Sequence, residues 1–373
     1  MKKNYFYLLI LFTASILQAQ ENKLNLIVGT YTRACESKGI YVYEFDSNTG
    51  DFSLKSNTEN VLNPSYLTVS NDNKFVYSVN QNQNGSNSSG VSSFKYNSET
   101  GKLDFINKQI ASADGPCHII SDDKNVITAN YFSGSISVFG KNSDGSIAGV
   151  KQIVQHLGKG INEKRQEKAH AHMTCFSPDR KYVLVSDLGT DKIYSYQYNP
   201  NSASEVLVFK DTVAAKPGSG PRHFSFSKDG KYVYLLQELD GTLTTFRYAN
   251  GILKKESETS ILAKDFVGEI GSADIHISPD GKFLYATNRG TANDISTFKI
   301  LKKGKLEFVS RTSTLGNGPR NFTIDPTGNF LLVGNQNSND IAIFKRDATT
   351  GSLTATGKKI ELCSPVCLVF TKI

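Results

Sequence analysis

One short phrase recurs along the chain at a nearly constant interval, and this repetition restricts the fold more than any other feature. Three of the six full copies begin with Gly-Pro, and each copy runs through an alternating stretch into a polar turn. The starts are Asn63-Pro64, Gly115-Pro116, His170-Ala171-His172, Gly220-Pro221, Ala273-Asp274, Gly318-Pro319 and the truncated Ser364-Pro365. A period of about 50 residues indicates an array of identical supersecondary units.

The unit at residues 220–254 shows what one repeat builds. Residues 223–226 alternate and lead into an Asp-Gly turn, and residues 232–236 are rich in aromatic and β-branched side chains. A third alternating stretch, 242–248, is followed by an Asn-Gly turn and a short fourth stretch, 252–254. The pattern predicts four antiparallel strands, which make one blade of a β-propeller.

The two ends of the chain predict how the array closes. Residues 364–373 supply only a first strand, whereas residues 24–30, 39–46 and 51–55 supply the other three. Six complete units and one blade shared between the termini make an all-β, seven-bladed β-propeller with four antiparallel strands per blade. Pairing the ends removes the open sheet edges that a linear array would expose.

Beyond the repeats, the first residues are typical of a secretory signal. Lys2 and Lys3 precede the apolar stretch Tyr7–Phe12, and Leu17-Gln18-Ala19 is a plausible cleavage site before Gln20. This order predicts a signal peptide over 1–19 and one propeller domain over 20–373. The apolar stretch is too short for a membrane anchor, and no Cys stands at the cleavage point. We therefore expect export to the periplasm or the extracellular space.

Charge and cysteine content exclude other classes. A formal charge of +7 with scattered basic residues makes nucleic acid a poor partner. Five cysteines are an odd number for an exported chain. A Cys363–Cys367 disulfide is conceivable, although an extended segment would hold the two Cα atoms too far apart. Cys175 reads as a small buried residue, and no Cys/His spacing fits a structural zinc site.

The strand order predicts which side chains share one mouth of the channel. First strands begin at the face where second strands end, because neighbouring strands are antiparallel. Counting back seven positions from the turn residues selects His172, Arg222 and Arg320 on different blades. The residue that follows the polar end of the second strand varies between blades, and it is Glu238 or Arg289 on two adjacent ones.

These side chains combine an acid/base pair with cations suited to a carboxylate, phosphate or oxyanion. The alternative is a polar channel mouth whose charges neutralise one another. The charged insertion 158–168, which contains Arg165, is either a solvated loop or a rim over the same face. His170 and His172 could bind a metal, but no third ligand is evident, so neither a metal nor a cofactor is predicted. His223 has two interpretations, a hydrogen-bonded core residue or a substrate contact.

At these residues the chain resembles the seven-bladed lactonase family, which includes propeller-type 6-phosphogluconolactonases and the carboxymuconate lactonizing enzyme. The motifs that carry the resemblance are Arg165-Gln166 before His170-Ala171-His172, Ser186-Asp187-Leu188-Gly189-Thr190-Asp191, Gly220-Pro221-Arg222-His223, Glu238-Leu239, and Ala273-Asp274 through Asn288-Arg289-Gly290. The resemblance implies that His172, Arg222, Glu238 and Arg289 are catalytic. Contacts to substrate are expected from His170, Arg165, Arg320 and His223.

The resemblance implies metal-independent hydrolysis of a sugar-acid lactone, with a small lactone or sugar acid as the ligand. Two alternatives stay open. One is a cycloisomerase that uses the same residues on an unsaturated diacid, and the other is a non-catalytic exported propeller that binds a sugar acid or a protein partner. Export also separates the chain from a phosphorylated lactone made in the cytoplasm.

Overall fold

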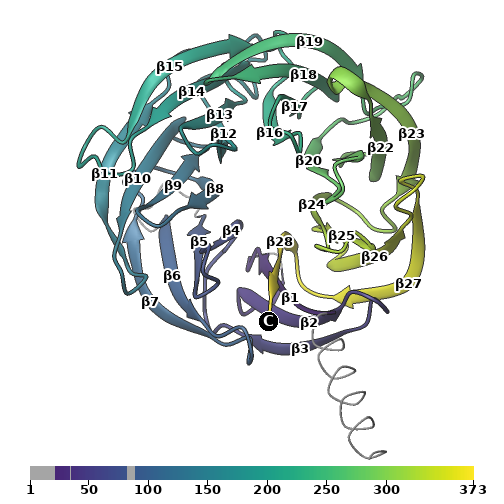
Figure 1. The fold of residues 1–373 in the computed structure, drawn as a ribbon, viewed down its shortest axis with the longest axis horizontal. Helices are drawn as coiled ribbons and strands as arrows, with labels where there is room; N and C mark the ends of the chain where they lie inside the picture. The colour runs from purple at the N-terminus through teal and green to yellow at the C-terminus, as the bar shows by residue number, and fades with distance from the viewer. Residues whose placement is uncertain (1–21, 34, 82–88) are drawn as a thin grey trace, which may run out of the picture.

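The predicted propeller is present in the computed structural model, which describes residues 22–33, 35–81 and 89–373. Seven four-stranded antiparallel sheets surround a central axis, and the first strand of each blade is innermost (Figure 1). The predicted signal peptide over 1–19 lies outside the described residues. Nothing helical within them has the length and apolar character needed to cross a membrane.

The blades are numbered along the chain, with strands given from the axis outward. Blade 1 contains β28 (Pro365–Lys372), β1 (Lys23–Thr30), β2 (Ile40–Asp46) and β3 (Phe52–Asn57). Blade 2 contains β4 (Leu67–Val69), β5 (Phe75–Asn80), β6 (Gly90–Tyr96) and β7 (Leu103–Ile110). Blade 3 contains β8 (Pro116–Ser121), β9 (Asn125–Asn130), β10 (Ser135–Lys141) and β11 (Ile147–Gln155). Blade 4 contains β12 (Ala171–Phe176), β13 (Tyr182–Asp187), β14 (Lys192–Tyr198) and β15 (Leu207–Ala214).

The remaining blades repeat the plan. Blade 5 contains β16 (Pro221–Phe226), β17 (Tyr232–Gln237), β18 (Thr242–Ala249) and β19 (Ile252–Ser260). Blade 6 contains β20 (Ser272–Ile277), β21 (Phe283–Asn288), β22 (Asp294–Ile300) and β23 (Leu306–Ser313), with the 3-10 turn η1 (Lys302–Gly304) before its last strand. Blade 7 contains β24 (Pro319–Ile324), β25 (Phe330–Asn335), β26 (Asp340–Arg346) and β27 (Leu353–Glu361).

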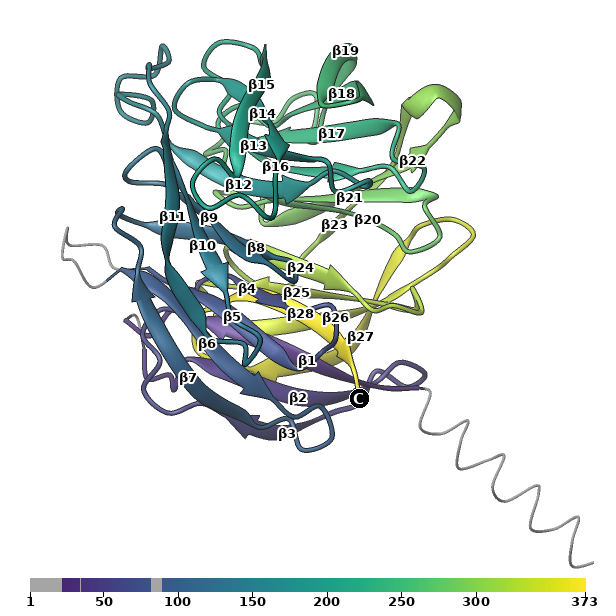
Figure 2. The ribbon, with the colours of Figure 1, turned by 60° about the vertical axis from the view of Figure 1, so that its left-hand side comes forward.

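Blade 1 closes the ring as expected. β28 pairs with β1 antiparallel (Figure 2). Leu26 of β1 lies opposite Phe370 of β28. The core lies between neighbouring blades, because both faces of each sheet are covered. In β17 five consecutive residues are buried, and Leu235 packs in one cluster with Leu184 of blade 4. This explains why second strands read as continuous apolar runs instead of alternating patterns.

Two expectations need correction. The fourth strand of blade 5 extends to Ser260 instead of residue 254, because the outermost strand is held by hydrogen bonds to β18 while most of its side chains face solvent. The disulfide joins Cys363 to Cys35, with Cα atoms 5.9 Å apart, and Cys367 is a buried free thiol. Cys35 lies in the loop after β1, which only ring closure brings beside Cys363.

Candidate active site

The side chains at the channel mouth are aimed by a bulge that recurs at the start of the inner strands. In β12 the ladder passes from Ala171 to Met173 while the partner strand advances one residue, so His172 is the extra residue. The same bulge occurs in β16, β24 and β8, where the extra residues are Arg222, Arg320 and Cys117. A bulge turns its extra residue out of the regular alternation, and here it directs one side chain per blade into the channel.

A backbone hydrogen bond to the segment before the first strand fixes the residue that follows the second strand. The backbone N–H of Glu238 donates to the carbonyl of Gly220 at 2.8 Å, and that of Arg289 donates to Gly271 at 3.1 Å. Gly220 has φ of +69°, a left-handed conformation that favours glycine. Each residue that follows a second strand is therefore clamped beside the bulge of its own blade, which confirms the register predicted from the repeats.

Glu238 is the centre of a buried ionic cluster. Its Oε1 lies 2.6 Å from Nη2 of Arg165, and its Oε2 lies 2.9 Å from Nε of Arg222 and 3.3 Å from Nη2 of Arg289. Nε2 of His172 lies 3.7 Å from the same Oε2. Glu238 and Arg222 are 5% and 2% exposed, so this carboxylate is desolvated and surrounded by cations.

The electrostatics of the cluster set the protonation state of each partner. Burial alone would raise the pKa of Glu238, but the charges of Arg289, Arg222 and Arg165 outweigh it and lower the pKa from 4.5 to about 2. Burial lowers the pKa of His172 well below 6.5, and the positive charge of Arg222 lowers it further. At neutral pH the site therefore holds an ionised carboxylate beside a neutral imidazole.

The insertion before β12 forms part of the rim, as one of its two interpretations predicted. Gln166 is buried and donates from Nε2 to the carbonyl of Leu188 at 2.8 Å, which pins the loop to the end of β13. Oδ1 of Asp187 accepts a hydrogen bond from the backbone N–H of His170 at 2.9 Å, and Oδ2 of Asp187 lies 2.6 Å from Nδ1 of His156. These anchors hold Arg165 over Glu238.

A cavity of about 390 Å³ opens above this cluster, which is large enough for a small metabolite. Of the predicted residues, His172, Glu238, Arg289, Arg165 and Arg320 line it, and Arg222 lies directly beneath. His170 does not line it, because its ring stacks on Tyr131 and its Nδ1 lies 2.9 Å from the Tyr131 carbonyl.

His223 also lies away from this cavity. Its ring is buried deeper in the channel, and its Nδ1 lies 2.8 Å from Oδ1 of Asp274. Oδ2 of Asp274 lies 2.9 Å from Nε2 of His276 and accepts a hydrogen bond from Asn321. This network crosses the middle of the channel, and it fits the first of the two interpretations of His223, a hydrogen-bonded core residue.

Sequence reasoning did not select several residues of the cavity wall. Gln81 and Tyr131 occupy the same position after the second strand as Glu238 and Arg289, so the register that found the charged residues also pointed to them. Tyr31 comes from the loop after β1, where no repeat signal marked it. Cys117 is the bulge residue of β8.

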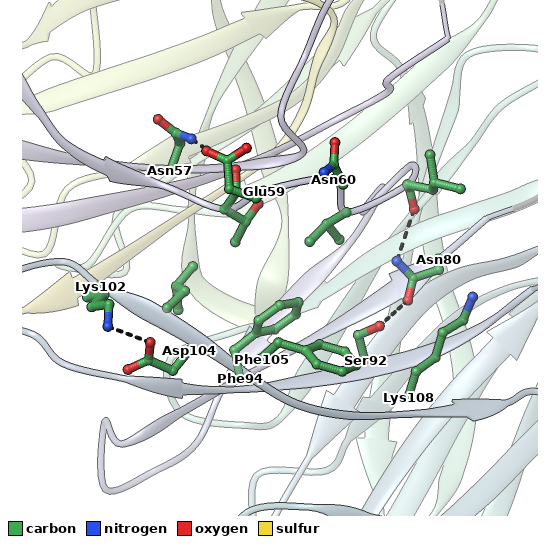
Figure 3. Close-up of a pocket in the computed structure, with 14 residues that line it drawn as sticks. Asn57, Glu59, Asn60, Asn80, Ser92, Phe94, Lys102, Asp104, Phe105 and Lys108 are labelled. Carbon is green, nitrogen blue, oxygen red and sulfur yellow. Dashed lines mark hydrogen bonds and ion pairs between the residues drawn. The ribbon is translucent and has the colours of Figure 1, made fainter.

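A larger cavity of about 630 Å³ lies between the outer strands of blades 1 and 2 (Figure 3). Phe94 and Phe105 contribute to its wall. Several of its polar groups pair with one another: Nζ of Lys102 lies 2.7 Å from Oδ1 of Asp104, and Ser92 donates to Oδ1 of Asn80 at 2.5 Å. It has no acid/base pair flanked by cations, so the channel mouth is the better candidate for chemistry.

Fold and site together define an all-β propeller with a charged small-molecule site at one mouth of its channel. The family model "Lactonase, 7-bladed beta-propeller" matches residues 25–370. The chain belongs to this seven-bladed lactonase family.

Relatives with similar sequences cover nearly the whole chain. A 6-phosphogluconolactonase of Formosa agariphila is 39% identical, over 88% of this chain and 94% of that protein. A 6-phosphogluconolactonase of Bacillus subtilis is 36% identical, over 92% and 97%.

Solved structures of similar proteins have the same fold over nearly the whole chain. A protein from Bacteroides fragilis superimposes with a TM-score of 0.90 at 41% identity, covering 94% of this chain and 99% of its own. The periplasmic gluconolactonase of Pseudomonas aeruginosa gives a TM-score of 0.88 at 35% identity, covering 93% and 99%.

Proposed function

We propose that this protein hydrolyses a sugar-acid lactone at the channel mouth, with His172, Glu238 and Arg289 acting on the substrate and Arg222 positioning Glu238. The observation that carries the proposal is the ionised Glu238, held by three arginines beside the neutral His172 at the base of an open cavity. The 6-phosphogluconolactonase and gluconolactonase names of relatives that span the whole propeller support the same reaction.

The positions of the four side chains assign each a separate role in the reaction. Water attacks the lactone carbonyl and passes a proton to Nε2 of neutral His172, and Glu238 at 3.7 Å stabilises the resulting imidazolium. Arg289, whose side chain is 20% exposed, faces the cavity and stabilises the oxyanion. The ring C–O bond then breaks, and the imidazolium returns the proton to the leaving alkoxide. Arg222 is too buried to reach substrate freely, so it positions Glu238.

Two further parts of the proposal concern the cell and the substrate. Residues 1–19 act as a signal peptide, so the mature propeller, residues 20–373, works outside the cytoplasm; a periplasmic relative of the same fold supports this. Arg165 and Arg320 contact the substrate from the rim. His170 and His223 support the site through their contacts with Tyr131 and Asp274.

The test is acid release in a pH-stat from a panel of lactones that includes 6-phosphogluconolactone and gluconolactone. The parent protein should release acid above the uncatalysed rate, and Glu238→Gln should lower kcat/KM by about 100-fold or more. Glu44→Gln is the matched control, because Glu44 pairs with Lys23 on the surface. If the parent opens no lactone, hydrolysis is refuted, and product analysis with muconate-type diacids tests the cyclising direction.

A further inference from the structure

Two buried polar atoms near the acid/base pair have no hydrogen-bond partner on another described residue. They are Nδ1 of His172 and Oγ of Ser65. His172 is 6% exposed and Ser65 is 3% exposed, so both atoms are shielded from bulk solvent. Native proteins rarely leave buried polar atoms unpaired, and buried water molecules commonly satisfy those that the chain does not.

Both side chains line one small cavity in the channel. Its volume is about 10 Å³, which is about the space that a single water molecule requires. His223 and Asn321 also contribute to its wall, so several polar groups surround the space. A site of this size with two to four polar partners is typical of a buried structural water.

Three blades bring these polar groups together at the axis of the propeller. Ser65 precedes β4 of blade 2, His172 is the bulge residue of β12 in blade 4, and His223 lies on β16 of blade 5 (Figure 1). The rings of His172 and His223 have centroids 5.3 Å apart and are inclined by 77°. Nδ1 of His172 makes no direct bond to His223, so a polar link at this nitrogen requires a bridging molecule.

Asp274 determines which nitrogen of His223 carries the proton. Nδ1 of His223 lies 2.8 Å from Oδ1 of Asp274. Burial would raise the pKa of Asp274, but the charge of His276 and the hydrogen bonds from His223 and His276 outweigh it and hold this pKa well below 3.8. Burial lowers the pKa of His223 to about 4, so its ring is neutral. An ionised carboxylate can only accept, which places the proton on Nδ1 and leaves Nε2 of His223 as an acceptor.

We propose that one water molecule occupies the small cavity, accepts a hydrogen bond from Nδ1–H of His172, donates one to Nε2 of His223 and is held by Oγ of Ser65. The proposal rests on the proposed hydrolysis, in which Nε2 of His172 accepts a proton. A neutral imidazole carries its proton on one nitrogen only, so an acceptor at Nδ1 selects the tautomer whose Nε2 is basic. Ser65, His223 and Asp274 are therefore positioning residues that set the tautomer and orientation of His172.

The first test reads the tautomer without turnover. In protein labelled with ¹⁵N-histidine, long-range proton–nitrogen correlations distinguish protonated from unprotonated ring nitrogens, and His172→Gln identifies the His172 signals among the six histidines. At neutral pH His172 should carry its proton on Nδ1. A proton on Nε2 of His172 in the parent protein would overturn the proposal.

A high-resolution crystal structure tests the bridge itself. It should show one water within about 3.2 Å of Nδ1 of His172 and of Oγ of Ser65. A cavity without density, or a halide ion in it, would overturn the proposal, because a halide cannot donate to Nε2 of His223. These two measurements on the parent protein decide the matter even where a variant does not fold.

Two variants of nearly equal size separate the hydroxyl of Ser65 from its volume. Ser65→Val removes the group that holds the water, so kcat should fall about 10-fold with KM changed less than about 3-fold. Part of the His172 population should also move its proton to Nε2. Ser65→Thr keeps the hydroxyl, and kcat should stay within about 3-fold of the parent value. Equal losses in the two variants would assign the effect to volume and overturn the proposal.

Thr297→Val is the matched control for the loss of a hydroxyl. Thr297 also has a buried hydroxyl without a partner, but it lies on β22, the third strand of blade 6, outside the channel wall. Neither kcat nor the tautomer of His172 should change in this variant. A loss equal to that of Ser65→Val would overturn the assignment to the water.

The two proposals fail in different ways. A parent protein that shows the Nδ1–H tautomer and the water but opens no lactone would refute hydrolysis and retain the positioning of His172. A parent protein that opens lactones, with kcat and tautomer unchanged in Ser65→Val, would retain hydrolysis and refute the positioning.

Discussion

The Nε atom of Arg222 lies 2.9 Å from Oε2 of Glu238, and neither side chain has appreciable contact with solvent. One comes from the bulge of β16 and the other from the residue after β17, so a single blade supplies both halves of the pair. Arg165 and Arg289 reach the same carboxylate from the rim and from the next blade. The pair therefore connects the stability of blade 5 to the charge state of the cavity.

Removing the carboxylate should be costly. In Glu238→Gln three guanidinium groups lose their shared counter-charge, and we expect the free energy of unfolding to fall by about 3 to 5 kcal/mol. Urea unfolding measures this loss. Glu44→Gln breaks a surface pair and should cost less than about 1 kcal/mol. Equal losses in the two variants would show that the buried cluster contributes no special stability.

The pH dependence of the reaction should lack an inflection near 6.5. His172 must be neutral to accept a proton, and its pKa is lowered well below 6.5 by burial and by Arg222. As the pH falls, His172 becomes charged only below its lowered pKa, so kcat/KM should be constant between about pH 6.5 and 8 and decrease at lower pH. A half-maximal rate near pH 6.5 would show that His172 titrates as an exposed histidine and would contradict its assignment as the base.

The disulfide should stabilise the closed ring. Cys35 and Cys363 are 328 residues apart in sequence, so the cross-link restricts almost the whole unfolded chain. Reduction should lower the free energy of unfolding by about 3 to 5 kcal/mol. Urea unfolding with and without a reductant measures the difference.

A variant without the disulfide supplies the control for this experiment. The double variant Cys35→Ser, Cys363→Ser should unfold at the same urea concentration with or without the reductant. If it still responds, the reductant acts on a disulfide that Cys117, Cys175 or Cys367 forms during unfolding, since all three are free thiols in the folded protein.

A glycine after β13 should be essential for the rim. A Cβ at Gly189 would lie 1.8 Å from the carbonyl oxygen of Lys168 and 2.8 Å from the backbone N of His170, so Gly189→Ala must displace the segment that leads to His172. We expect both kcat/KM and the thermal midpoint to fall. Gly149→Ala is the matched control, because a Cβ there meets no atom within 4 Å and should leave both unchanged or raise stability by up to about 1 kcal/mol.

Much of this architecture could be predicted because it is local and repeated. The polar turn, the Pro at the start of the first strand and the variable residue after the second strand recur in most blades, so Arg222, Glu238 and Arg289 could be placed on one face from spacing alone. The outer strand of blade 5 was predicted too short, since its solvent-facing side chains carry no hydrophobic alternation.

The number of blades, the strand that closes the ring and the face that collects the charged side chains follow from periodicity along the chain. Which of these charges are paired depends on contacts between blades. Ring closure brings Cys35 beside Cys363 and Arg320 beside Tyr31 from opposite ends of the chain. Burial keeps His172 neutral, whereas the three neighbouring arginines keep Glu238 ionised against the effect of burial. These depend on distances and solvent exclusion between residues remote in sequence, which a local pattern does not contain.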